Sequence, residues 1–166
     1  RGTHHLTTHP HDDGVMLGGV DAVSTAGYDA VVSLCRMGTR RVSSDHVEFW
    51  LVDDGHDSNA NLEFVLDDAA RTVQALRAEG KRVLLHCVQA HSRTPSVAAR
   101  YSMLIGRDPY DVRSAMPWAR PKRELWNTAV GNASVGHTAV GYTGGSMPAI
   151  TVVEGDITTL TVDAIV

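Results

Sequence analysis

The chain has few of the residues on which several protein classes depend. Two cysteines without a Cys-x-x-Cys pair in 166 residues exclude a disulfide scaffold and disfavour a zinc site, and a reactive thiol fits a reducing compartment. The net charge of −4 disfavours a nucleic-acid partner, which would need a basic face. There is no signal peptide, lipidation motif or bilayer-length apolar run, so we expect a cytoplasmic protein without a membrane partner.

The remaining composition, 43% hydrophobic and 20% charged, suits one globular core. Apolar, β-prone runs predict strands over residues 28–35, 47–52 and 82–86, and helical periodicity predicts helices over 61–80, 93–106, from 108 and over 121–129. Asn61 is expected to cap the first helix. Strands separated by helices predict an α/β fold with one central, mainly parallel sheet flanked by helices, and a ligand site at the carboxyl ends of its strands.

The most informative segment places a cysteine and an arginine six positions apart, between an apolar strand and a helix start. Residues 87–92, here named the Cys87 loop, would turn their backbone N–H groups and the positive end of the following helix toward one anion. This field favours the thiolate of Cys87, and the planar guanidinium of Arg93 can bind two phosphoryl oxygens. A lone cysteine is more often a core thiol, but the whole pattern favours attack by sulfur on a phosphate ester. The residues expected to bind the phosphate are Val88, Gln89, Ala90, His91, Ser92 and Arg93.

The pattern His-Cys-x5-Arg-Thr resembles the signature of the cysteine-dependent protein tyrosine phosphatases, and the compact chain resembles their dual-specificity branch. The resemblance extends over residues 14–130 and includes Leu17-Gly18-Gly19, similar to an early glycine-rich turn, and Arg120-Pro121, similar to a pair between the last helices. It implies a protein tyrosine phosphatase-like sandwich that uses no metal or cofactor. The chain departs from the family at Ala90, where glycine is usual and can adopt positive φ.

Release of the leaving oxygen requires a proton donor, and three aspartates follow a predicted strand end. The resemblance places the general acid two residues beyond the last apolar strand position, at Asp54, with Asp53 the next candidate. Asp57 belongs to the same loop, and all three could instead be turn or capping residues.

Several residues are expected to support this chemistry. By the resemblance, His86 holds the loop through hydrogen bonds, and Cys35 could trap oxidised Cys87 as a disulfide, as in some family members, or be a core thiol. Thr94 could donate its hydroxyl to the sulfur or cap the helix. His91 could add charge at the rim or face solvent. We expect a polar arm from the N-terminal histidines, namely His4, His5, His9 and His11.

The composition changes after residue 130, so residues 1–130 form the predicted phosphatase-like domain. Residues 131–148 contain five glycines and no charged side chain, which predicts a flexible linker. Residues 149–166 resemble the opening strands of a macro domain, in which Asp156 would contact the adenine of ADP-ribose. The segment ends before that family's next ligand motif, so we favour extra strands on the phosphatase sheet, with possible self-association through them.

The sequence therefore predicts a phosphoric monoester hydrolase that acts through a thiophosphate-enzyme intermediate. Phosphotyrosine or dual-specificity substrates are favoured, so the expected partner is a phosphorylated protein or a small phosphate ester. Two alternatives stay open. One is a phosphatase of ADP-ribose phosphates in a macro-domain fusion, and the other is a phosphate-binding pseudophosphatase without turnover.

Overall fold

The computed structural model describes residues 5–25, 27–39, 42 and 44–131. The predicted macro-domain-like strands, and the predicted linker beyond Gly131, lie outside the described residues.

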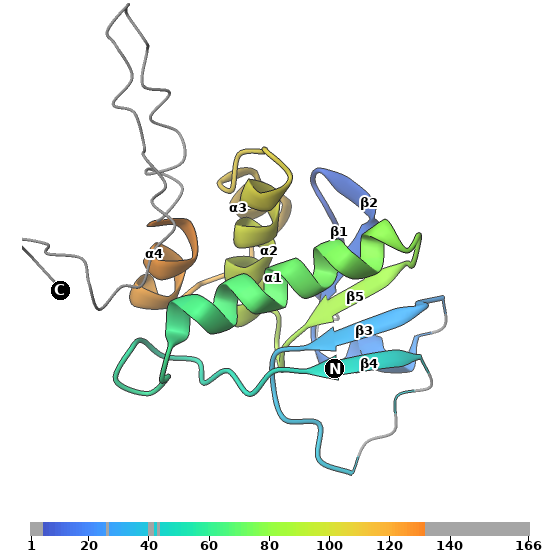
Figure 1. Cartoon of the computed structure of the whole chain (residues 1–166), viewed down its shortest axis with the longest axis horizontal. Helices are drawn as coiled ribbons and strands as arrows, with labels where there is room; N and C mark the ends of the chain where they lie inside the picture. Colours follow the sequence, from blue (N-terminus) through green and yellow to red (C-terminus); the bar gives the residue numbers. More distant parts are fainter. Residues whose placement is uncertain (1–4, 26, 40–41, 43, 132–166) are drawn as a thin grey trace, which may run out of the picture.

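A five-stranded sheet forms the centre of the molecule (Figure 1). Its order is β1-β2-β5-β3-β4, and only the β1–β2 pair is antiparallel. This arrangement confirms the predicted α/β class with a mainly parallel sheet. The strands are β1 (Leu6–His9), β2 (Asp12–Gly18), β3 (Ala30–Ser33), β4 (Asp45–Glu48) and β5 (Val83–His86).

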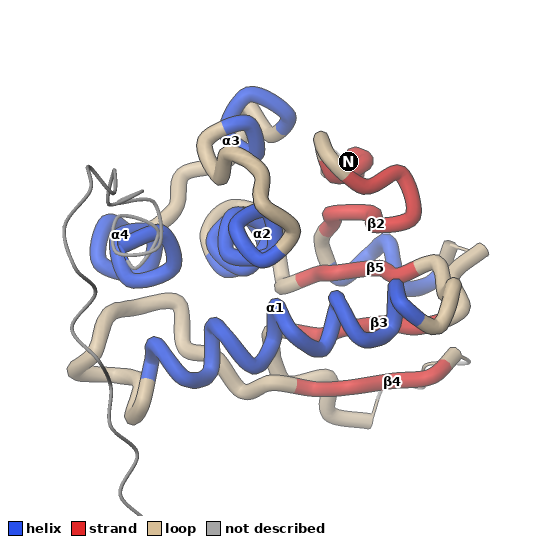
Figure 2. Tube along the Cα trace, turned by 45° about the horizontal axis from the view of Figure 1, so that its top comes forward, coloured by secondary structure: helices blue, strands red, loops and turns tan. Residues whose placement is uncertain are grey.

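The helices cover one face of the sheet, and a short 3-10 helix covers the other. Figure 2 shows α1 running lengthwise over β3, with α2 and α4 beside it. Helix α1 buries an apolar stripe at helical spacing, which runs from Leu62 to Val73 and packs on the sheet. The opposite face packs against η1 through Ala22, Val31 and Leu84. The helices are η1 (Val20–Ser24), α1 (Leu62–Ala78), α2 (Arg93–Leu104), α3 (Asp111–Ala115) and α4 (Arg123–Gly131).

The central strands β3 and β5 are buried at every position, which explains why they were readable as unbroken apolar runs. The prediction for β4 was wrong in its bounds, since the strand runs over Asp45–Glu48 and not over 47–52. This strand has a neighbour on one side only, and its ladder ends where Phe49 N donates to Ser33 O. The apolar residues that follow leave the sheet and lead toward the Cys87 loop.

Two further expectations are corrected. Asn61 precedes α1, but its side chain makes no capping hydrogen bond, because its backbone is left-handed at φ 55°. The prediction of a polar arm is wrong for its described part: His9 lies buried in β1, and His11 contacts Asp111 at 3.0 Å. These imidazoles find partners on α2 and α3, and the N-terminal segment forms the two strands β1 and β2. His4 lies outside the described residues. In the described part of the chain, no helix is both long and apolar enough to cross a membrane.

Candidate active site

Cys87 follows the central strand β5 directly, and α2 begins at Arg93, as the sequence predicts. The parallel register aligns His86 with Gly18 of β2 and with Ser33 of β3, so Cys87 lies in the middle of the carboxyl edge of the sheet. The cysteine is 2% exposed. The cysteine therefore lies below the protein surface, between the end of β5 and the start of α2.

Ala90 gives the Cys87 loop its shape. Its φ of 57° lies in the left-handed region, and the residue is fully buried. Alanine thus adopts a left-handed backbone conformation, which glycine adopts more readily. The departure at this position changes the side chain and leaves the left-handed turn in place.

A glycine turn from β2 packs against the same loop. Val20 N donates to Val88 O at 3.0 Å, and a Cβ on Gly19 would lie 3.0 Å from that oxygen. A side chain at Gly19 would push the two segments apart. The predicted glycine-rich turn is therefore a close contact beside the Cys87 loop.

Arg93 is fixed by two backbone carbonyls. Its Nη1 donates to Leu34 O at 3.1 Å and to Leu51 O at 2.9 Å, which lie beyond the ends of β3 and β4. Its Nε is buried and has no hydrogen-bond partner among the described residues. An unpaired buried donor on a fixed guanidinium is typical of a site that takes an acceptor from outside the protein.

The loop that contains Arg120-Pro121 braces the Cys87 loop from the outside. Arg120 N donates to His91 O at 2.8 Å, and Lys122 N donates to Ser92 Oγ at 2.9 Å. The Ser92 hydroxyl thus accepts a hydrogen bond from the segment that braces the loop. Thr94 Oγ1 contacts Gly18 O at 3.4 Å, so its hydroxyl pairs with the glycine turn here.

The predicted acid loop is held by one asparagine. Asn59 Oδ1 accepts from Val52 N, and its Nδ2 donates to the carbonyls of Val52, Asp54 and Gly55. Asp54 is exposed and accepts a hydrogen bond from Ser58 Oγ at 2.9 Å. That bond, with the Gly55 backbone, holds the pKa of Asp54 below its usual range. Asp53 and Asp57 are also exposed.

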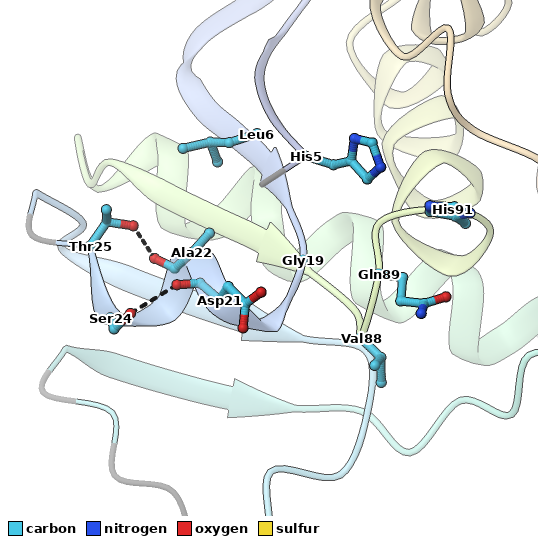
Figure 3. A pocket seen from close by; sticks show the side chains of 10 residues that line it. All are labelled: His5, Leu6, Gly19, Asp21, Ala22, Ser24, Thr25, Val88, Gln89 and His91. Carbon is cyan, nitrogen blue, oxygen red and sulfur yellow. Dashed lines mark hydrogen bonds between the residues drawn. The ribbon is translucent and has the colours of Figure 1, made fainter. Parts of the chain in front are cut away.

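A cavity of about 550 Å³ opens beside the Cys87 loop (Figure 3). Gln89 and His91 line it, and the ring of His91 meets His5 edge to face at 5.2 Å. His5 in turn stacks on Trp118 at 4.8 Å. The two loop side chains therefore face a shared cavity, as expected for rim residues. The other lining residues are Leu6, Gly19, Asp21, Ala22, Ser24, Thr25 and Val88.

The second cysteine, Cys35, follows β3, the strand that pairs with β5. Ser33 and His86 are paired in register, and Cys35 and Cys87 follow them by two residues and one. Both are buried thiols. Within the described residues, no group of three or more His, Cys, Asp or Glu side chains could hold a metal ion.

The fold is shared with solved phosphatase structures, although no family model matches the chain. Human DUSP28 is 20% identical with a TM-score of 0.65, over 78% of this chain and 93% of that one. The Yvh1 phosphatase domain from Chaetomium thermophilum is 19% identical with a TM-score of 0.65, over 81% and 99%. The fold is that of the protein tyrosine phosphatases.

A mouse putative dual specificity phosphatase complexed with zinc tungstate has the same fold, at 20% identity and a TM-score of 0.64, over 78% of this chain and 90% of that one.

Two features of the structure were not predicted from the sequence: the β1–β2 hairpin, and the contacts of Arg93 with Leu34 and Leu51. The alternation of Val15 and Leu17 after Pro10-His11 is the pattern that could have revealed the hairpin.

Proposed function

We propose that the chain is a cysteine-dependent phosphatase that hydrolyses phosphate monoesters. The observation that carries this proposal is the setting of Arg93, six residues after a cysteine at the carboxyl end of β5. Two backbone carbonyls hold its guanidinium, and its buried Nε has no hydrogen-bond partner among the described residues. The likeness to dual-specificity phosphatases supports it.

The mechanism uses two displacements at phosphorus. The Cys87 thiolate attacks in line while loop amides and Arg93 hold the equatorial oxygens. The bond from phosphorus to the leaving oxygen breaks, and the general acid transfers its proton to that oxygen. The resulting carboxylate then takes a proton from water, which attacks phosphorus, breaks the S–P bond and restores the thiolate.

Asp54 is the first candidate for the acid and Asp53 the second. The hydrogen bond from Ser58 keeps Asp54 charged in the free protein. A phosphate dianion bound nearby would raise the pKa of a carboxyl beside it, because two like charges repel. Substrate binding can therefore supply the protonated acid that the first step requires.

Replacement of the nucleophile and of the anion-binding group tests the proposal. Cys87→Ser should abolish hydrolysis of a small aryl phosphate while vanadate still binds, because the amides and Arg93 remain. Arg93→Lys should lower turnover roughly a hundred- to thousandfold, since an ammonium cannot replace a two-pronged donor. Unchanged turnover in either variant would exclude this mechanism, and vanadate binding by a wild-type protein without turnover would indicate a pseudophosphatase.

The substrate class is tested by a panel of a phosphotyrosine peptide, a phosphoserine peptide and ADP-ribose-1″-phosphate. We expect phosphotyrosine to be hydrolysed fastest. A preference for the ADP-ribose ester would favour the macro-domain fusion alternative.

A further inference from the structure

A hydrogen-bonded chain of three side chains connects the protein surface to the nucleophile. Ser33 Oγ lies 2.9 Å from His46 Nε2 and 2.6 Å from His86 Nε2. His86 Nδ1 lies 3.1 Å from Cys87 O. Ser33 and His86 are fully buried, whereas His46 is exposed on the edge strand β4. These hydrogen bonds thus link three neighbouring strands, β4, β3 and β5, and end at the first residue of the Cys87 loop.

The partners determine where the hydrogens lie. A carbonyl oxygen can only accept, so His86 Nδ1 must carry the hydrogen that it shares with Cys87 O. In a neutral imidazole the other nitrogen is then an acceptor, and Ser33 donates its hydroxyl hydrogen to it. Ser33 has no second hydrogen, so its oxygen accepts from His46 Nε2. In each of these three hydrogen bonds, the acceptor is therefore the group nearer to Cys87.

The bond at the end of the chain affects the anion site. With Cys87 O engaged by His86, that oxygen is kept out of the anion cradle, where it would repel a phosphate. The other tautomer of His86 would place a lone pair against this oxygen and would release it. The tautomer of one buried histidine therefore sets the direction of the first carbonyl of the loop.

We propose that Ser33 and His46 are positioning residues that lock His86 in its Nδ1–H tautomer and thereby orient the Cys87 loop. The inference rests on the proposed function only in taking Cys87 as the nucleophile. It assigns a role to two residues outside the loop: Ser33 on β3, and His46 on β4 at the surface.

The test combines a spectroscopic signature with the reactivity of Cys87. Long-range ¹H–¹⁵N NMR spectra of the wild-type protein should show His86 as the Nδ1–H tautomer. Ser33→Ala should weaken that signature, because His86 Nε2 loses its donor, and should slow the alkylation of Cys87 by iodoacetamide roughly tenfold, the effect of one buried hydrogen bond. Peptide mass spectrometry separates Cys87 from Cys35. His46→Phe should have a smaller effect, because water can replace an exposed donor.

Two further variants keep the test decisive. Ser33→Thr retains the hydroxyl and should restore both the tautomer and the alkylation rate. Ser102→Ala is the matched control, because Ser102 is a fully buried serine whose Oγ lies 3.1 Å from His9 Nε2, on β1. It should leave Cys87 unchanged. An Nε2–H tautomer in the wild type, or equal losses in Ser33→Ala and Ser102→Ala, would overturn the proposal.

Neither readout requires turnover. A protein that fails to hydrolyse aryl phosphates would therefore contradict the proposed function, while the tautomer of His86 would still be decided by the spectra.

Discussion

Ala90 is a single residue on which the geometry of the whole Cys87 loop depends. A left-handed backbone costs a non-glycine residue about 1–2 kcal/mol, and this alanine is held there at φ 57° by complete burial. The surrounding loop, the Gly19 turn and the 120–122 brace fix the conformation from three sides.

We predict that Ala90→Gly changes turnover by less than about threefold, because the loop already has the conformation that glycine would adopt. Relief of about 1–2 kcal/mol of strain is offset by the flexibility of glycine and the loss of a buried methyl group, about 0.5–1 and 0.8 kcal/mol. Urea unfolding should therefore show little change. Ala90→Val should lose more than about 2 kcal/mol. A glycine variant that is a hundred times faster would show that alanine suppresses turnover.

The charge state of Asp54 gives a second prediction. Ser58 lowers the pKa of this carboxyl through its hydrogen bond, so Ser58→Ala should raise it. A general acid acts while protonated, so the basic limb of the kcat profile should move to higher pH in Ser58→Ala and flatten in Asp54→Asn. Asp53→Asn is the matched control. If Asp53→Asn flattens the limb and Asp54→Asn does not, the acid is Asp53.

At the scale of the elements, the strands that could be predicted are those buried on both faces. The apolar runs of β3 and β5 reveal them, and the helices follow from periodicity. The β1–β2 hairpin was missed because its histidines and aspartates resemble an exposed segment. Their partners lie on α2: His9 contacts Ala98 and Asp12 contacts Tyr101, each 89 residues further along the sequence. Such contacts leave no local pattern in a sequence.

For the candidate site, the local part could be predicted from the sequence and the long-range part could not. The positions of Cys87 and Arg93 follow from a local strand-to-helix pattern. The carbonyls of Leu34 and Leu51 that hold Arg93 depend on chain direction after β3 and β4, which side-chain patterns do not report.

The loop after β4 depends on Asn59, and a prediction follows from its four hydrogen bonds. Asn59→Ala leaves buried backbone groups unpaired, so we expect a loss of about 2–3 kcal/mol in unfolding free energy. Turnover of poor leaving groups should fall further than that of activated aryl phosphates, because the acid loop loses its shape. Asn127→Ala, at an exposed position of α4, should change neither. If Asn59→Ala lowers the turnover of both substrates by the same factor, the shape of this loop does not affect proton donation.

The paired strands β3 and β5 are each followed by a buried thiol, Cys35 and Cys87. We predict that mild peroxide inactivates the protein reversibly, because Cys35 traps the sulfenic acid of Cys87 as a disulfide before further oxidation. Cys35→Ala should then be inactivated largely irreversibly, as measured by recovery of turnover with dithiothreitol. Equal recovery of both proteins would show that Cys35 is a core thiol only.

For the whole molecule, a polar network joins the N-terminal hairpin to two helices. Asp12 of β2 accepts from Arg77 Nε at 2.9 Å and from Tyr101 Oη at 2.7 Å. Burial raises the pKa of Asp12, but these bonds outweigh it and leave the pKa below the ordinary value. On the same hairpin, His9 Nδ1 accepts from His11 N, and its Nε2 contacts Ala98 O at 3.2 Å. His9 is therefore neutral in the folded chain, and burial lowers its pKa below 6.5.

Stability should consequently fall as the pH drops below the ordinary histidine range. The unfolded chain binds a proton at His9 near pH 6.5, whereas the folded chain binds it only at lower pH, so acid favours unfolding. Urea unfolding between about pH 5 and 7.5 should show a shallower slope of free energy with pH in His9→Gln. His56→Gln, which replaces an exposed histidine, is the control. The same slope in His9→Gln and wild type would exclude His9 as the group.

The position of β5 between β2 and β3 has a consequence for how the molecule is made. During synthesis, β2 and β3 leave the ribosome well before β5, and neither pairs with the other in the finished sheet. The edges of β2 and β3 that pair with β5 stay unpaired until residues 83–86 have been synthesised, which follows the synthesis of α1. Late insertion of a central strand is slow and exposes a nascent chain to aggregation. It also means that Cys87 reaches its place at the carboxyl edge of the sheet only after β5 has joined its two neighbours.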